Sequence, residues 1–199
     1  MFMGINLISI SSLLLFLLIG VFVVDTDLAM QKKAEVKMLL ELANHHATFA
    51  VDSVMKTEGV IELVEDEALA RFADRMSENG GYQLAQNAFI PSAATVTTDP
   101  LPFVRHYIDF RSWQRDLDMV LRYDGEDLVL EQAVPGTARS EGGRLRIRVI
   151  TQQGEVLELA PKTMVGPSHV VVAYVDESPF LPILPGHSFP VVSVEEVKR

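Results

Sequence analysis

The sequence predicts an α+β protein in which an N-terminal transmembrane helix continues into a long amphipathic helix, followed by a second helix and an antiparallel β-sheet. Three observations carry this prediction. An uncharged apolar segment opens the chain, apolar residues then recur at helical spacing, and beyond residue 102 apolar and polar residues alternate. We expect four parts: a transmembrane anchor over 1–25, a helical stalk and the second helix over 26–80, a linker over 81–102 and an antiparallel β domain over 103–199.

The composition limits the class of protein. The 199 residues are 48% hydrophobic, yet their formal net charge is −10. The first 24 residues contain no Asp, Glu, Lys or Arg, so every charged side chain falls in a body of ordinary soluble composition. This distribution argues against a polytopic transporter, a disordered chain and a basic nucleic-acid-binding protein. The absence of cysteine excludes disulfides, thiol catalysis and thiolate metal sites.

The apolar segment 5–24 is long enough to cross a hydrocarbon core of about 30 Å as a helix. A cleaved secretory signal is the alternative, but no basic side chain precedes the segment and no small-x-small cleavage site follows it. We therefore expect an uncleaved anchor whose partner is the lipid bilayer. The predicted anchor residues are Ile5, Leu13, Leu14, Leu15, Phe16, Leu17, Leu18, Ile19, Val21, Phe22, Val23 and Val24.

The segment after the anchor predicts a continuous helix. No proline or glycine interrupts residues 27–56, and six apolar residues recur there at alternating spacings of four and three, which places them on one helical face. The alanines among them let another element approach closely. That element is either the chain's own sheet or a neighbouring subunit, which would make the protein a homo-oligomer. The predicted interaction seam is Val36, Leu40, Ala43, Ala47, Ala50 and Val54.

The remaining elements follow from changes of period. A second helix is predicted from Ile61 to about Ser77, with the glycines at 80–81 as its stop. The polar, proline-containing stretch 81–102 predicts a connection. Period-two alternation then predicts strands, with a hairpin turn at Asp124-Gly125 and one fully buried strand over 169–175. The expected strands cover 104–110, 117–123, 127–133, 144–149, 156–160, 169–175 and 191–197.

Few residues qualify as catalytic or metal-binding. His45 and His46 are adjacent on a helix and point about 100° apart, so they cannot easily bind one metal ion. Ser53 and Lys56 match S-x-x-K, the nucleophile motif of penicillin-recognising enzymes, but its partner motifs are missing. We therefore predict no catalytic residue, no metal site and no cofactor, and hence a protein that is not an enzyme.

A basic stripe on one predicted strand raises the question of nucleic acid. The stripe consists of Arg144, Arg146 and Arg148, which alternate with apolar residues. In a chain of net charge −10, it predicts a sheet surface paired with Glu155 and Glu158 across a hairpin rather than a nucleic-acid groove. We expect no nucleic acid among the partners.

The layout resembles a known family. A single span followed by a helix of the form Q-x-x-A…A-x-x-A, here Gln31-Lys32-Lys33-Ala34 and then Ala43, Ala47 and Ala50, is similar to the membrane-anchored pilin-like proteins of the tight-adherence (Tad) pilus system, the TadE/TadG-like group. The resemblance covers about residues 5–55. It implies a pilin-like layout, other pilus or membrane-apparatus subunits as partners and an extracytoplasmic C-terminal domain. It does not extend to prepilin processing, because Ser9 stands where pilin-like proteins carry a glutamate.

Three functions are therefore open. The leading expectation is a non-enzymatic, single-span protein of a bacterial surface assembly that makes protein contacts. The second is a membrane-anchored ligand-binding or sensory domain with a pocket lined by His106 or Tyr107, and the third is a membrane-bound hydrolase using Ser53 and Lys56. The lysines at 32, 33 and 37 favour a cytoplasmic body by the positive-inside rule, against the orientation that the resemblance implies.

Overall fold

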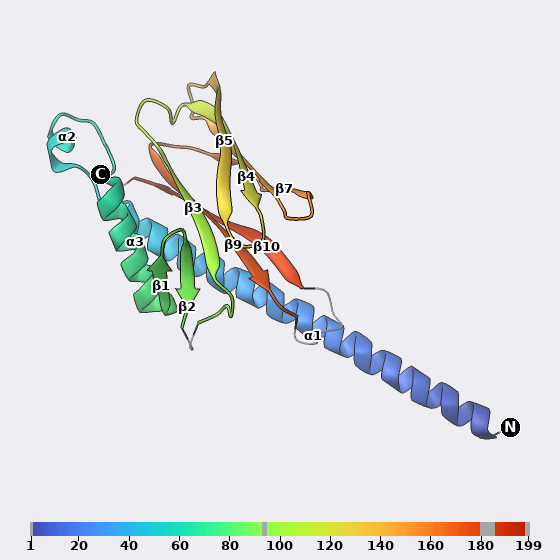
Figure 1. Ribbon diagram of the computed structural model, residues 1–199. Helices are drawn as coiled ribbons and strands as arrows, with labels where there is room; N and C mark the ends of the chain where they lie inside the picture. Colours follow the sequence, from blue (N-terminus) through green and yellow to red (C-terminus); the bar gives the residue numbers. More distant parts are fainter. Residues whose placement is uncertain (1, 93–94, 180–185, 198–199) are drawn as a thin grey trace.

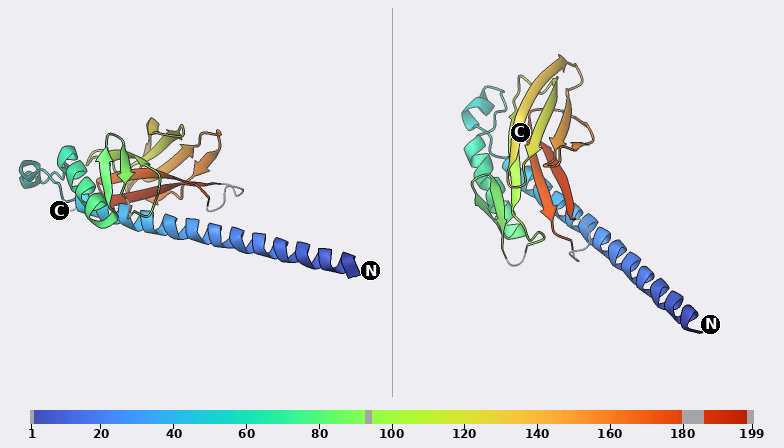
Figure 2. Two further views of the ribbon diagram at one scale, coloured as in Figure 1. Left: turned by 60° about the horizontal axis from the view of Figure 1, so that its bottom comes forward. Right: turned by 45° about the vertical axis from the view of Figure 1, so that its right-hand side comes forward.

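The computed structural model describes residues 2–92, 95–179 and 186–197, with side chains from residue 8 onward. The molecule is an α+β protein in three layers, as the sequence predicts. The two long helices cover one face of a first sheet, and a second sheet covers its other face (Figures 1 and 2). The N-terminal part of the first helix projects away from these layers.

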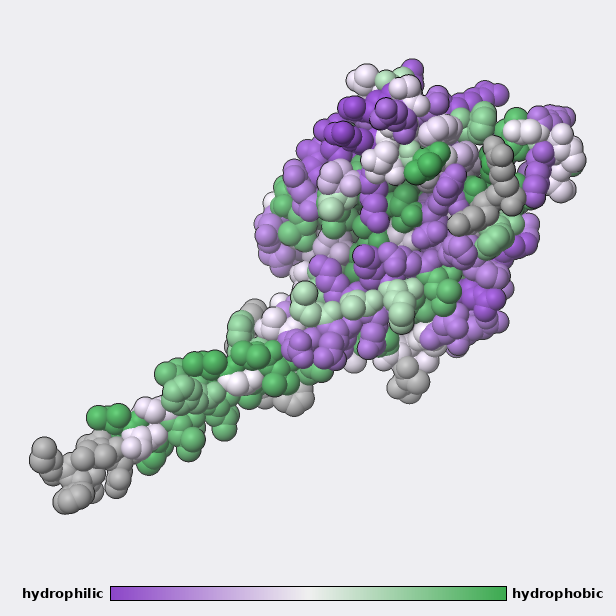
Figure 3. Space-filling model, turned by 180° about the vertical axis from the view of Figure 1, so that it is seen from behind, coloured by the Kyte–Doolittle hydropathy of each residue, from purple (hydrophilic) through white to green (hydrophobic). Residues whose placement is uncertain are grey.

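The first helix, α1, spans Phe2–Ala47 and joins the predicted anchor and stalk into one rod. From residue 8 to residue 24 its side chains are exposed, apart from the half-buried Val21. This helix is long and apolar enough to cross a membrane, which confirms that part of the prediction. Its apolar end appears in green in Figure 3. Ile5 belongs to the helix, but its side chain lies outside the described part of the chain.

The predicted continuation of this helix to Lys56 is wrong, because α1 ends at Ala47. The hydroxyl of Thr48 donates to the carbonyl oxygen of His45 at 2.7 Å, and Val51 then forms a β-bridge with Leu63. A separate helix, α2 (Ser53–Thr57), begins after the N-cap Asp52. The helix therefore ends through β-branched residues and a tertiary pairing rather than through a glycine or proline.

The second predicted helix is α3, Glu65–Gly80. It begins four residues later than Ile61, because the 61–64 segment is extended and the amide of Val64 donates to the carbonyl of Ala50 at 2.8 Å. Its stripe of Ala68, Phe72 and Met76 is buried, as the periodicity predicts. A left-handed Gly81 closes the helix, which confirms the predicted glycine stop.

Two five-stranded sheets make up the remaining layers. The first has the order β1-β2-β3-β9-β10, and the second has the order β5-β4-β6-β7 with β8 paired to β6. The β4–β6 pair is parallel and every other pair among the described residues is antiparallel. The strands are β1 (Tyr82–Ala85), β2 (Ala88–Pro91), β3 (Leu101–Ile108), β4 (Arg115–Tyr123), β5 (Leu128–Ala138), β6 (Arg144–Ile150), β7 (Val156–Glu158), β8 (Lys162–Thr163), β9 (Ser168–Glu177) and β10 (His187–Glu196).

The stretch 81–102, predicted as a linker, contains the β1–β2 hairpin. Tyr82 and Phe89 from its two strands are fully buried, and Gln86 adopts the left-handed conformation (φ 54°) that its tight turn requires. The hairpin extends the first sheet through the pairing of β2 with β3. Each strand has only four residues, which is too short for a recognisable alternation.

Strand β9 separates the two hydrophobic cores. Val171, Ala173 and Val175 pack on the helical side, whereas the alternate residues, including Val172 and Tyr174, pack toward the second sheet. All of them are at most 1% exposed. The predicted fully buried strand is thereby confirmed, since a strand with apolar layers on both faces has no reason to alternate.

Candidate functional site at the helix–domain junction

The predicted seam packs against the chain's own domain. Val36, Leu40, Ala43 and Ala47 are fully buried and join a core formed with α3, β9 and β10. Ala50 is also buried, although it follows the end of α1. Val54 is 66% exposed on α2 and therefore lies outside this packed face. In this structure the buried seam holds the domain to the helix and is closed to a neighbouring subunit.

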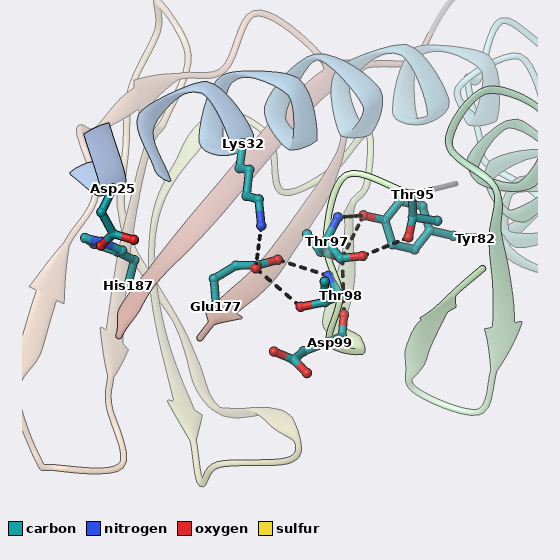
Figure 4. Close-up of polar contacts among 9 residues, drawn as sticks. All are labelled: Asp25, Lys32, Tyr82, Thr95, Thr97, Thr98, Asp99, Glu177 and His187. Atoms are coloured by element: carbon teal, nitrogen blue, oxygen red, sulfur yellow. Dashed lines mark hydrogen bonds and ion pairs between the residues drawn. The ribbon is translucent and has the colours of Figure 1, made fainter. Parts of the chain in front are cut away.

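The domain contacts α1 at Asp25, the residue that follows the apolar segment. Asp25 is 5% exposed, and its Oδ2 lies 2.6 Å from Nε2 of His187 at the start of β10 (Figure 4). One turn later, Ala29 is also buried against the domain. The contact face of the helix thus begins at the border of the apolar span.

A second polar link lies two turns along the helix from Asp25. Lys32 Nζ binds Oε2 of Glu177 at 2.7 Å, and Glu177 is only 4% exposed at the end of β9. The other carboxylate oxygen, Oε1, accepts from the backbone amide of Thr98 at 3.2 Å (Figure 4). Because a buried carboxylate is costly unless it is paired and hydrogen-bonded, these contacts fix Lys32 and the 95–99 segment relative to β9.

The 95–99 segment is also held to the hairpin. The amide of Thr97 donates to the Tyr82 hydroxyl at 3.2 Å, and the two hydroxyl oxygens of these residues lie 2.8 Å apart. Thr97 in turn donates to the carbonyl of Asp99 at 3.2 Å. Burial raises the pKa of the Tyr82 phenol, so this network is neutral. The polar cluster therefore connects α1, β1, β9 and β10 at one end of the domain.

A cavity of about 300 Å³ lies within this cluster. The opposite charges that line it are paired with one another, as Asp25 with His187 and Lys32 with Glu177. Across the part of the chain that the structure describes, no group of three or more His, Asp or Glu residues is placed to hold a metal ion. The cavity lining is Asp25, Leu28, Ala29, Lys32, Thr98, Glu177, Ser178 and His187.

A third polar group is fully buried where α1 crosses β9 and β10. The side-chain amide of Asn44 donates to Ser193 Oγ and to the carbonyl of His169, both at 3.0 Å. Its oxygen therefore accepts from Nδ1–H of His169 at 2.6 Å, which fixes the tautomer of the imidazole. Burial, together with the nearby charges of Arg105 and His106, lowers the pKa of His169 to about 4, so the ring is neutral near pH 7.

The two adjacent histidines of α1 contact two different elements. His45 Nδ1 lies 3.4 Å from a carboxylate oxygen of Glu195 on β10, whereas His46 Nε2 lies 3.1 Å from a guanidinium nitrogen of Arg75 on α3. Burial and the charge of Arg75 lower the pKa of His46, so its ring accepts this hydrogen bond as the neutral form. The two rings therefore contact different elements of the domain and do not converge on one site.

The remaining candidate residues of the sequence either have a structural role or lie at the surface. The Tyr107 hydroxyl accepts from the amide of Leu63 and donates to the carbonyl of Ile61, each at 3.3 Å, so it fixes the 61–63 segment. Burial lowers the pKa of its half-buried neighbour His106. Ser53 and Lys56 are exposed on the five-residue α2.

The arginine stripe on β6 is paired differently from the prediction. Arg146 binds Asp118 of the parallel strand β4 at 2.7 Å, and only Arg148 stands opposite a predicted partner, Glu158, in the β6–β7 register. The main-chain amide of Arg144 donates to Asp116. The parallel β4–β6 pairing, which the sequence does not predict, brings the β4 carboxylates beside the stripe.

The junction was not predicted from the sequence. Asp25 and His187 are 162 positions apart, and Lys32 and Glu177 are 145 apart, so no local pattern relates them. The one available signal was the position of Asp25, an acidic residue on the same helical face as Val36 at the end of an uncharged span. A carboxylate there must reach water or find a partner.

Comparison with protein-family models, with curated proteins and with solved structures gave no match. The resemblance to the TadE/TadG-like group therefore stays a prediction from the sequence pattern.

Proposed function

We propose that this chain is a non-enzymatic, single-span membrane protein of a bacterial surface assembly of the pilus type, whose extracytoplasmic domain makes protein contacts. The observation that carries the proposal is the continuity of α1. Its apolar end is exposed on nearly every side, and from Asp25 onward one face of the same helix is buried against the domain. Exposed apolar side chains on this scale require a lipid or protein environment.

The junction supports a mechanical role for the cluster. Its charged side chains bind one another across the helix–domain contact, and its hydroxyl groups bind main-chain atoms, one another or Glu177. Such an arrangement sets the position of a domain relative to its anchor. It presents no nucleophile activated by a base within the contacts described above.

The hydrolase alternative has less support. A catalytic lysine in an S-x-x-K motif needs burial to act as a base, whereas Lys56 is exposed. The ligand-binding alternative loses one of its two residues, because the Tyr107 hydroxyl is bound to main-chain atoms. These positions favour protein contacts as the role of the domain.

Membrane fractionation tests the anchor. Replacing Leu17 and Leu18 with lysine places two charges in the span, each costing about 3 kcal/mol at the centre of a membrane helix. We expect the wild-type chain to stay in the membrane pellet after alkaline carbonate extraction and the double variant to be released. The matched control places the same two lysines at Asp74 and Ser77 on the exposed face of α3 and should stay in the pellet.

Labelling of intact cells tests the orientation. The chain contains no cysteine, so Asp74→Cys provides a single thiol on the exposed face of α3. We expect a membrane-impermeant maleimide to label this variant on intact cells, with the cysteine-free wild type as background. Labelling that requires cell lysis would place the domain in the cytoplasm and refute the surface assignment.

A further inference from the structure

The side of α1 opposite the domain carries an exposed apolar ridge. Met30, Ala34, Met38 and Leu42 follow one another at intervals of four, so they lie along one line of the helix. Met30, Met38 and Leu42 are 62%, 66% and 50% exposed, and Ala34 is exposed as well. In Figure 3 a narrow apolar band runs along the helix between hydrophilic surfaces. Four consecutive exposed apolar positions are unusual for a surface helix, whose solvent side is ordinarily polar.

The two flanks of this ridge carry opposite charges. At about 100° per residue, Glu35 and Lys37 lie about 80° to either side of the line midway between Ala34 and Met38. Both side chains are exposed. Lys37 Nζ lies 3.7 Å from a carboxylate oxygen of Glu41, which follows one turn along the helix on the same flank, about 40° from the line of the ridge. At the level of Ala34 and Met38 the ridge therefore has an acidic edge at Glu35 and a basic edge at Lys37, with Glu41 one turn beyond the basic edge.

A common membrane restricts how two copies can meet. Copies inserted by the same span have parallel helices, and a twofold axis between parallel helices places the left flank of one beside the right flank of the other. In such a pair, Glu35 of each copy lies beside Lys37 of the other, offset by about 3 Å along the helix. The charges thus attract each other at both edges of the pair. An antiparallel pair is excluded, because it would require the two copies to be inserted into the membrane in opposite directions.

The geometry of the ridge fits the same arrangement. Ridges formed by residues four apart interlock at a crossing angle of about −50°, which corresponds to a tilt of about 25° for each helix. That tilt lies within the range of about 0–40° found for transmembrane helices. The contact is closest at Ala34, the smallest residue of the ridge. Asp27, bound at 3.1 Å by Gln31 of the same helix, lies nearer the membrane, where the crossing helices diverge.

We infer that a second copy of this chain is the partner of the ridge, in a parallel, twofold-symmetric pair centred on Ala34 and Met38. This inference rests on the proposed membrane anchoring. The ridge alone is smaller than a stable soluble interface, and confinement of both copies to one bilayer supplies the effective concentration that the contact needs.

Cysteine crosslinking in the full chain locates the contact. The variants Ala34→Cys and Met38→Cys each introduce the only thiol of the protein. In membranes, mild oxidation should convert both into a covalent dimer of twice the monomer mass. Lys33→Cys, exposed on the same helix but about 120° from the centre of the ridge, is the matched control and should stay monomeric.

A charge exchange tests whether the partner is identical. Glu35→Lys makes both edges basic and should lower the dimer yield of Met38→Cys about tenfold, because two symmetric attractions become repulsions. Adding Lys37→Glu exchanges the edges and should restore the yield. A different partner protein would keep its own charges and would no longer match the exchanged edges. Loss of contact in the double variant would therefore overturn the homotypic pair.

The outcomes separate this inference from the proposed function. Carbonate-resistant protein that gives no crosslink at Ala34 or Met38, or only an adduct of another mass, overturns the pair and leaves the anchor intact. Equal crosslinking of Lys33→Cys also overturns it, because collision rather than a defined face would explain the dimer. Release of the wild-type chain by carbonate refutes the proposed anchoring itself.

Discussion

At the scale of single residues, buried polar groups connect α1 to the sheet. Asn44, His169 and Ser193 are each at most 1% exposed, and their hydrogen bonds cross three elements that lie far apart in the sequence. Asn44 on α1 forms these hydrogen bonds only when its side chain faces β9 and β10. They therefore fix the rotation of α1 about its axis relative to β9. An apolar seam alone would allow the helix to slide or turn.

The buried imidazole predicts a pH dependence. The pKa of His169 is about 4 in the folded protein and about 6.5 when unfolded, so the unfolded chain binds the extra proton between these values. Stability is therefore complete above about pH 6.5 and falls as the pH drops toward 4, by about 3 kcal/mol. Denaturant unfolding of the detergent-solubilised full chain at several pH values measures this slope.

The control for this prediction is His169→Gln. The variant is less stable at neutral pH, because Asn44 loses its partner, but its free energy of unfolding should fall less steeply over the same pH range. The contribution of His46 is common to both proteins and cancels in the difference, whereas that of His106 cancels only in part, because its charge acts on His169. Identical slopes in the two proteins would show that His169 is not the group that titrates.

At the scale of elements, the two faces of α1 contribute very differently to the free energy of unfolding. Leu40 is fully buried against the domain, whereas Met38, two residues earlier, is 66% exposed. We expect Leu40→Ala to lower the free energy of unfolding of the domain by about 2–5 kcal/mol, and Met38→Ala to change it by less than about 0.5 kcal/mol. Urea titration followed by the fluorescence of the single tryptophan measures both; similar losses would contradict the assignment of the faces.

The elements also show what the sequence could predict. The span, the buried stripe of α3 and most strands after residue 103 follow from periodicity, which burial on one or two faces imposes directly. The end of α1 at Ala47 and the parallel β4–β6 pair depend on tertiary pairing, and the four-residue strands of the β1–β2 hairpin are too short to show an alternation. The junction pairs depend on the folded topology in the same way, so residue patterns could indicate the anchor but not the cluster that holds the domain to it.

At the scale of the whole molecule, the three layers share one strand. Because β9 contributes alternate residues to both cores, neither core can lose its packing without exposing an apolar face of this strand. Helix α1 contacts the same sheet from outside and is thereby included in the same unit. The domain should therefore unfold as one cooperative body.

Matched substitutions on β9 test this cooperativity. Val171→Ala removes contacts on the helical side and Val172→Ala on the side of the second sheet, and each should cost about 2 kcal/mol. For both variants we expect the tryptophan fluorescence of the second-sheet layer and the helical circular dichroism of the domain to change at the same denaturant concentration. Separate transitions for the two signals in either variant would mean that the layers unfold independently.

The unbroken course of α1 has one further consequence. From Asp25 to Ala47 the helix runs for about 34 Å outside the apolar segment, without a hinge, and the domain is fixed along this length. If α1 spans a membrane as proposed, this part of the helix is a rigid arm that pivots where the apolar segment ends. A change of about 10° in the tilt of the span moves its far end sideways by about 6 Å, carrying the whole domain with it. Lipid thickness or a neighbouring helix that alters this tilt would thus be felt as displacement at the outermost surface of the protein.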